Sequence, residues 1–135
     1  MSKTIVTISQ DFTFEAAHSM PTQKDFLEQT QIHGHSFSIR IELSGEVNPE
    51  SGTVENFELV HRKFDDLINQ LDHRYLNDIE GLETPTMENI GFWVLSRGQA
   101  IDQRLNAVTV GRPTLGQTCR IVRTSPEDGH LKTGI

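Results

Sequence analysis

The stretch IHGHSFSIR, residues 32–40, contains two histidines separated by one residue and opens a run in which polar and apolar side chains alternate as far as Leu43. Alternation with a period of two is typical of a β-strand with one buried face. Because strand side chains repeat their direction every second residue, His33 and His35 lie on the same face. One short segment can therefore present two imidazoles to a single point.

A third histidine ends another strand-like run. Residues 6–17 read as a strand, and His18 follows them before a polar loop leads to the pair. Three histidines at two strand ends match a catalytic zinc site, in which three protein nitrogens leave a fourth position for water or substrate. We predict that His18, His33 and His35 bind Zn²⁺; the alternative is that each is an ordinary polar strand-end residue. Since His18 falls on the face of Phe14, we expect a local twist to turn it toward the metal.

The remaining apolar pattern predicts two helices and two further strands. Residues 57–71 place apolar side chains at helical intervals and would cover one side of the sheet. A second helix begins at Thr86, its N-cap, with Glu88 in the first turn, where the macrodipole favours negative charge. Strands are predicted at 107–110 and 118–122. This order predicts an α+β domain with an antiparallel four-stranded sheet and both helices on one face.

Length, charge and cysteine content set further limits. The 135 residues, 35% of them hydrophobic, suffice for one domain, which we place at 1–124, followed by a polar tail at 125–135. A net charge of -7, from 12 Lys and Arg against 19 Asp and Glu, argues against binding to nucleic-acid phosphates. Cys119 is the single cysteine. The start of the chain lacks the apolar core of a signal peptide, and no apolar run reaches membrane-spanning length. We therefore expect a protein of the reducing cytoplasm.

Four segments carry a resemblance to a known family. They are FTFEAAHSM at 12–20, HGHSFSIRIELSGEV at 33–47, LDHRYLND at 71–78 and PTMEN at 85–89. They resemble the 6-pyruvoyl-tetrahydropterin synthase and 6-carboxy-tetrahydropterin synthase family, in particular its bacterial branch in queuosine biosynthesis. The resemblance implies a tunnelling fold, whose protomers assemble as trimers, commonly paired into hexamers, with sites at subunit interfaces. It also implies a zinc-dependent lyase that acts on a dihydropterin such as 7,8-dihydroneopterin triphosphate.

The resemblance also assigns roles to single residues. The zinc ligands of the family fall on His18, His33 and His35, the same three that the spacing selects. Asp72 and His73 match the family's catalytic aspartate and histidine, which implies a proton relay. An acidic residue beside a histidine can orient it and tune its proton affinity near pH 7, although such a pair on its own is more often a cap or a surface pair.

Besides the mild change at Asn56, where the family has an aspartate, two positions of the predicted site depart from the family pattern. The family has a catalytic cysteine shortly before the HGH segment, and residues 24–32 contain none. Glu28 is our candidate for the substitute base, because a carboxylate accepts a proton whereas the neighbouring amide of Gln29 cannot. The alternative is a solvated loop glutamate.

Arg112 stands where the family has a glutamate that anchors the pterin base. The guanidinium of Arg112 only donates hydrogen bonds, so it favours a carboxylate, a phosphate or a carbonyl-rich ring.

The substrate side of the site is predicted from the same comparison. Thr86 and Glu88 lie in the segment that borders the pterin pocket of the family, and with Arg112 they are the predicted contacts to a small pterin-like molecule. The two departures favour a second class of function, a divergent zinc-binding paralogue with an altered substrate or no synthase activity. Turnover of dihydropterins by the zinc-loaded protein separates the two classes.

Overall fold

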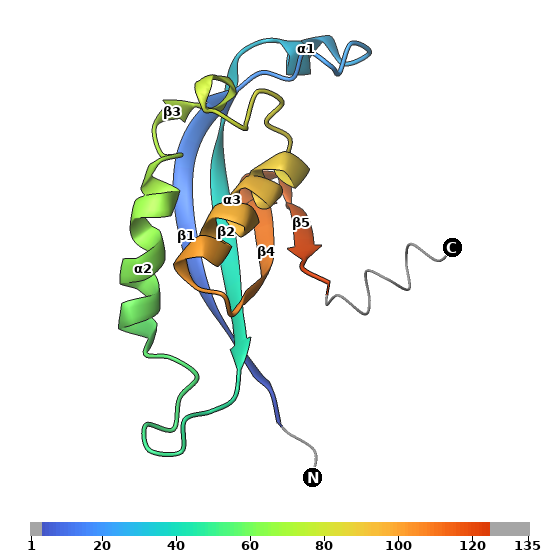
Figure 1. Cartoon of the computed structure of the whole chain (residues 1–135). Coiled ribbons are helices and arrows are strands. Elements are labelled where there is room, and N and C mark those ends of the chain that lie inside the picture. Colours follow the sequence, from blue (N-terminus) through green and yellow to red (C-terminus); the bar gives the residue numbers. More distant parts are fainter. Residues whose placement is uncertain (1–3, 125–135) are drawn as a thin grey trace, which may run out of the picture.

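The structure is a computed structural model and describes residues 4–124, so the predicted tail at 125–135 lies outside the described residues. Five strands, three α-helices and two short 3₁₀ helices form a curved sheet with the two longer helices packed against it (Figure 1). In chain order the elements are β1 (Val6–His18), α1 (Leu27–Thr30), β2 (His33–Gly45), α2 (Phe57–Asn69), β3 (Arg74–Tyr75), η1 (Leu76–Asp78), α3 (Met87–Ile101), β4 (Leu105–Arg112), η2 (Pro113–Leu115) and β5 (Gln117–Val122).

The strands lie in the order β3-β1-β2-β4-β5. β1 and β2 pair antiparallel from Val6 opposite Gly45 to His18 opposite His33, with no shift of register. β4 and β5 extend the sheet with two more antiparallel pairings. The four predicted strands are thus confirmed, but the prediction of four strands only was wrong, because the short strand β3 joins β1 in parallel. Two residues are too few for a period-two pattern to appear in the sequence.

The helices cover the apolar face of the sheet, as predicted. Alternate residues of β2 such as Phe37 and Ile39 are buried, and Phe37 stacks on Phe14 of β1 with ring centroids 4.9 Å apart. Both helices add to this core with the residues Val60, Phe64, Leu67, Ile68, Ile90, Trp93 and Val94. The core ends at one end of β1 and β2, where the three histidines continue its face.

Side-chain caps fix where the two long helices begin. Asn56 accepts a hydrogen bond from the backbone N–H of Glu58 at the start of α2. Thr86 accepts one from the N–H of Asn89 at the start of α3, which confirms it as the N-cap. Such caps satisfy backbone donors that the first helical turn leaves free. Neither helix, nor α1, is long and apolar enough to cross a membrane.

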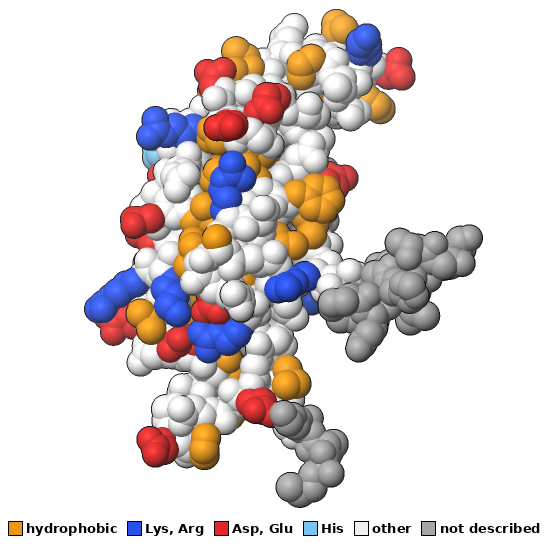
Figure 2. Space-filling view, in the orientation of Figure 1, with side chains coloured by type: hydrophobic (Ala, Val, Ile, Leu, Met, Phe, Trp, Pro, Cys, Tyr) orange, Lys and Arg blue, Asp and Glu red, His pale blue; other side chains and the backbone are white. Residues whose placement is uncertain are grey.

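The other face of the sheet is polar. Arg40 of β2 pairs with Asp11 of the neighbouring strand β1 at 2.8 Å, and Arg120 of β5 reaches over β4 to pair with Glu42 of β2 at 2.9 Å. On the helix-bearing side, basic and acidic side chains are intermingled over the surface (Figure 2).

Candidate functional site

Strand pairing brings the three histidines together. His18 lies directly opposite His33, and Ala16 lies opposite His35. Residues that oppose each other in an antiparallel pair point to the same face, so all three imidazoles extend the helix-covered face that Phe37 occupies. The local twist that we predicted for His18 is therefore not needed. The sequence pattern showed the face of each strand separately, whereas the register shows that the two faces coincide.

The histidine cluster is compact. Ring centroids are 4.5 Å apart for His18 and His33, 4.8 Å for His33 and His35, and 5.0 Å for His18 and His35. Taking one ring nitrogen from each, the three nitrogens all lie within 4.8 Å of one another. His18 is completely buried, and the other two are half-buried.

Hydrogen bonds determine which ring nitrogens of the histidines remain free to bind a metal ion. The Nδ1 of His18 lies 2.9 Å from the carbonyl oxygen of Pro85, and the Nδ1 of His33 lies 2.8 Å from that of Gln31. A carbonyl only accepts, so each Nδ1 carries the hydrogen and each Nε2 keeps its lone pair. The Nε2 atoms of His18 and His35 are buried and have no hydrogen-bond partner. Metal-binding histidines commonly donate their other N–H to a carbonyl in this way, so the cluster fits a metal ion.

The electrostatics of the cluster favour neutral imidazoles. Burial lowers the pKa of the His18 ring, and the nearby charges of His33 and Arg112 lower it further. Burial is also the main cause that lowers the pKa of His35 to about 4, with contributions from His18, Arg112 and His33. Near pH 7 these rings are therefore in the deprotonated form that binds metal.

A cavity of about 380 Å³ adjoins the cluster. Glu28, in the single turn of α1, lines it together with His33 and His35. The loop that carries Glu28 is tied back by the backbone N–H of Met20, which donates to the carbonyl of Gln29 at 2.8 Å. The structure thus brings the predicted base next to two of the predicted metal ligands.

Arg112 lines the same cavity from the end of β4. Its Nε is buried without a hydrogen-bond partner. Burial lowers the pKa of its guanidinium, while the charge of Glu88 acts in the opposite direction. Arg112 pairs in register with Gln117 of β5, which also lines the cavity.

Asp72 and His73 form the predicted pair, at the turn between α2 and β3. The Nδ1 of His73 lies 3.0 Å from a carboxylate oxygen of Asp72. The other oxygen of Asp72 accepts from the backbone N–H of Glu15 at 2.9 Å, and this bond is the main cause that lowers the pKa of Asp72. His73 has a positive φ of 58°, and its own N–H donates to the Glu15 carbonyl. These bonds fix the pair against the edge of β1.

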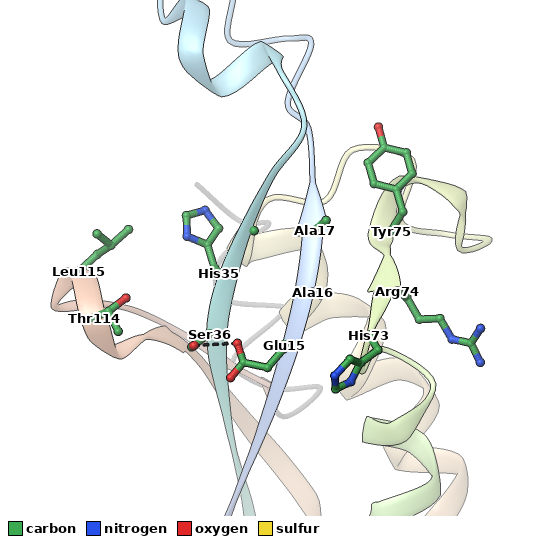
Figure 3. Close-up of a pocket in the computed structure, with 11 residues that line it drawn as sticks. Glu15, Ala16, Ala17, His35, Ser36, His73, Arg74, Tyr75, Thr114 and Leu115 are labelled. Atoms are coloured by element: carbon green, nitrogen blue, oxygen red, sulfur yellow. Dashed lines mark hydrogen bonds between the residues drawn. The ribbon is translucent and has the colours of Figure 1, made fainter.

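His73 does not reach the histidine cluster of its own chain. Its side chain is 78% exposed, and it lines an open pocket of about 920 Å³ whose other wall includes His35. In Figure 3, His35 lies beside β2 and His73 lies beyond β1, so the strand pair stands between them. Any joint action of these groups needs a substrate that spans the pocket or a second copy of the chain.

The predicted substrate residues on α3 have separate places. Thr86 is engaged as the N-cap, and the exposed Glu88 acts electrostatically on Arg112 without an ion pair to it within the described residues. Sequence reasoning missed the carbonyls of Pro85 and Gln31, because backbone groups leave no signature in the sequence. It also missed Gln117, which lies between the strands predicted at 107–110 and 118–122 and whose only signal is its polarity.

Comparison with known proteins shows the family and the fold. The sequence pattern of a family described as 6-pyruvoyl tetrahydropterin synthase matches residues 7–122. A 6-carboxy-5,6,7,8-tetrahydropterin synthase of Synechocystis is 38% identical over 95 residues, 67% of this chain and 72% of that protein. The Caenorhabditis elegans 6-pyruvoyl tetrahydropterin synthase superposes with a TM-score of 0.81 at 23% identity, covering 92% of this chain and 99% of that one.

A further solved structure shares the fold. It is a Plasmodium vivax 6-pyruvoyltetrahydropterin synthase, described as a catalytic-residue mutant in which a glutamate is replaced by cysteine. Its TM-score is 0.70 at 19% identity, over 91% of this chain and 100% of that one. At this level of identity the likeness shows a shared fold.

Proposed function

Because the chain belongs to the 6-pyruvoyl tetrahydropterin synthase family, we propose that it is a zinc-dependent lyase acting on the side chain of a dihydropterin such as 7,8-dihydroneopterin triphosphate. One observation carries the proposal. His18 and His35 keep buried Nε2 atoms without partners, within a three-histidine cluster that borders a cavity containing Glu28. A buried polar atom left without a partner costs about 1–3 kcal/mol, so an arrangement with two of them favours a ligand that binds both.

Each residue of the site would have a separate role in the reaction. His18, His33 and His35 would hold the metal. When bound, Zn²⁺ would supply Lewis-acid chemistry, withdrawing electrons from substrate oxygens so that the neighbouring C–H becomes more acidic. Glu28 would accept the proton from that carbon, as a general base. His73, oriented by its 3.0 Å contact to Asp72, would deliver or relay a proton to the product side.

Two findings support Glu28 as the base. It lines the cavity beside His33 and His35, although the sequence alone left it equally open to a solvated role. The Plasmodium vivax structure, by its description, concerns an enzyme with a glutamate as a catalytic residue, so this fold can employ a carboxylate in catalysis. A carboxylate also needs no neighbouring base to activate it near pH 7, because its ordinary pKa lies far below that pH.

We further propose that the active form is a homo-oligomer, a trimer or a hexamer, and that His73 serves the cavity of a neighbouring copy. The separation of His73 from its own histidine cluster supports this arrangement. So do the edges of the sheet: within residues 4–124, β5 has no strand beyond it, and only the two residues of β3 pair with the outer edge of β1.

The second candidate function is a zinc-binding paralogue without synthase activity. The observation that favours it is Arg112, which places an unpaired cation in the cavity. Incubation of the zinc-loaded protein with 7,8-dihydroneopterin triphosphate tests both candidates, with product formation followed by chromatography. We expect turnover that disappears when zinc is withheld. A correctly folded, zinc-saturated protein that leaves this substrate and simpler dihydropterins unchanged would exclude the lyase and support the paralogue.

A further inference from the structure

Arg112 is a cation that lacks a partner inside the candidate site. It is half-buried, its Nε is buried, and its side chain makes neither a hydrogen bond nor an ion pair with any residue between 4 and 124. A guanidinium does not lose its proton in proteins, so it cannot escape the cost of burial by becoming neutral. Burying part of such a donor group without a hydrogen bond is unfavourable, and a ligand that offers acceptors to it offsets the cost.

The acidic residues around the cavity do not fill this role. Glu88 acts on Arg112 only at longer range, and its side chain is exposed on the first turn of α3. Glu28 lines the cavity but is also exposed and forms no ion pair with Arg112. The remaining titratable groups that face the cavity, His33 and His35, would be engaged by the metal. A bound molecule that offers acceptors can therefore pair with Arg112 without displacing an existing ion pair.

The shape of the site limits what that molecule is. A cavity of about 380 Å³ has the size of a small-molecule site. Arg112 presents N–H donors and no acceptor, so it matches carbonyl oxygens on the edge of a ring and not amino groups there. Next to it, Gln117 offers an amide that can both donate and accept. A ring edge bearing amino and imino N–H groups would instead set donors against donors.

We propose that Arg112 is a specificity-determining residue, and that the ring accepted by this site presents an acceptor edge to β4, as a pyrimidine-dione does, instead of the amino-substituted edge of a pterin. This inference rests on the proposed function, which places the ring of the bound molecule beside the three histidines. It refines the ring preference of that same site, which should bind a dione more tightly than an aminopyrimidinone.

A matched pair of rings tests the assignment. Pteridine-2,4-dione and 2-aminopteridin-4-one differ only in the substituent at ring position 2, so their relative affinity reports on the edge that Arg112 contacts. Calorimetric titration of the full zinc-loaded chain should show at least about tenfold tighter binding of the dione, because each mismatched buried donor weakens binding by that order. Arg112→Glu should reverse the preference, and Arg112→Gln, which both donates and accepts, should abolish it.

Controls separate this inference from the proposed lyase activity. Arg123→Glu makes the same change of net charge on an exposed residue outside the cavity and should leave the preference unchanged. Equal affinities in the parent, a preference for the amino ring, or a preference that survives Arg112→Gln would each overturn the assignment, as would failure of both rings to bind. A dione preference that depends on Arg112, in a protein with no turnover of any dihydropteridine, would leave the assignment standing and remove the lyase proposal.

Discussion

At the scale of single residues, the histidine cluster is prepared for a ligand before one binds. Two Nδ1 atoms are held by carbonyl oxygens, so the tautomers and ring orientations of His18 and His33 are set by the backbone. The pKa of His35 is lowered to about 4, chiefly by burial, so protons do not compete for its lone pair near pH 7. Preorganised, neutral nitrogens raise affinity because little ordering or proton release accompanies binding.

The first prediction concerns metal content. We expect about one Zn²⁺ per purified chain, because three neutral imidazoles with an open fourth position suit that ion. The double substitution His33→Ala and His35→Ala should reduce metal content to background in elemental analysis. His61→Ala is the control, since His61 is an exposed residue of α2 that stacks on Phe12 away from the cluster. Full metal occupancy in the double variant would refute the assignment of the site.

The second prediction concerns the base. Glu28→Gln keeps the size and polarity of the side chain but cannot accept a proton, so turnover should fall by a factor of about 10² or more while zinc is retained. The matched control is Asp25→Asn, an exposed acid of the same loop that does not line the cavity. Rates of product formation and zinc content are measured together on all three proteins. A Glu28→Gln rate equal to that of the parent would show that Glu28 is a solvated loop residue.

The sequence predicts side-chain chemistry at this scale better than it predicts distance. The His-x-His spacing selects His33 and His35 because a strand has a fixed period, and strand ends then suggest His18. The pair Asp72 and His73 is also visible in the sequence, and the structure confirms their contact. The sequence does not show where this pair lies in space. In the structure β1 and β2 separate Asp72 and His73 from the histidine cluster, and that placement depends on the path of the turn after α2.

At the scale of elements, an ion-pair network anchors the end of α3. Asp102, the C-cap residue of α3 and 8% exposed, receives hydrogen bonds from the guanidinium of Arg104 at 2.7 Å and 3.0 Å. Lys63 of α2 reaches the same carboxylate at 3.3 Å, and Arg104 continues to Glu55 at 2.8 Å. The network therefore links both helices to the start of β4.

This network gives the third prediction. The Arg104 hydrogen bond is the main cause that lowers the pKa of Asp102 to about 2. The stabilisation is fully present above the ordinary value of 3.8 and is lost as the pH falls from there to about 2, because the folded state then has to take up a proton that the unfolded chain already holds. A shift of this size corresponds to about 2 kcal/mol of unfolding free energy.

Urea unfolding at a series of pH values checks the effect. Asp102→Asn should lower the unfolding free energy by about 1–3 kcal/mol near neutral pH, since Arg104 and Lys63 lose their anionic partner. It should also flatten the decline of stability below pH 4. Asp66→Asn, an exposed acid on α2, serves as the control. An unchanged pH profile in the Asp102 variant would show that the network does not stabilise the fold.

Elements with a repeating pattern could be predicted, and those without one could not. Both long helices and four strands follow from apolar periodicity, which reflects burial against a common core. The single-turn helix α1 and the two-residue strand β3 are too short to show a period. Phe57 begins the predicted apolar stripe of α2 yet is 52% exposed, because it lies at the helix end beyond the edge of the core. Periodicity identifies a face but not how far the core extends along it.

At the scale of the whole molecule, the residues proposed for the candidate site do not all lie together within one chain. The metal histidines, Glu28 and Arg112 border one cavity, whereas Asp72 and His73 lie beyond β1. A closed ring of identical copies would repeat one interface at every junction, so His73 of each copy would face the cavity of the next. The open edge at β5 and the thinly covered edge at β1 are suited to such a ring.

The last prediction follows from this geometry and is tested by subunit mixing. One inactive variant carries His73→Ala and keeps the metal site; the other carries His33→Ala with His35→Ala and keeps His73. If each site takes its metal ligands from one copy and His73 from the next, random exchange in an equal mixture unites both intact halves at about one quarter of the sites. Activity should therefore return to roughly that fraction of the parent after dissociation and reassembly, whereas a site built within one chain would regain nothing.

A mixture of the double histidine variant with Glu28→Gln is the matched control, because both substitutions then fall in the half of the site that a single chain provides. That mixture should stay inactive whatever the degree of exchange, and its recovery would show that Glu28 acts across the interface instead of beside its own histidines.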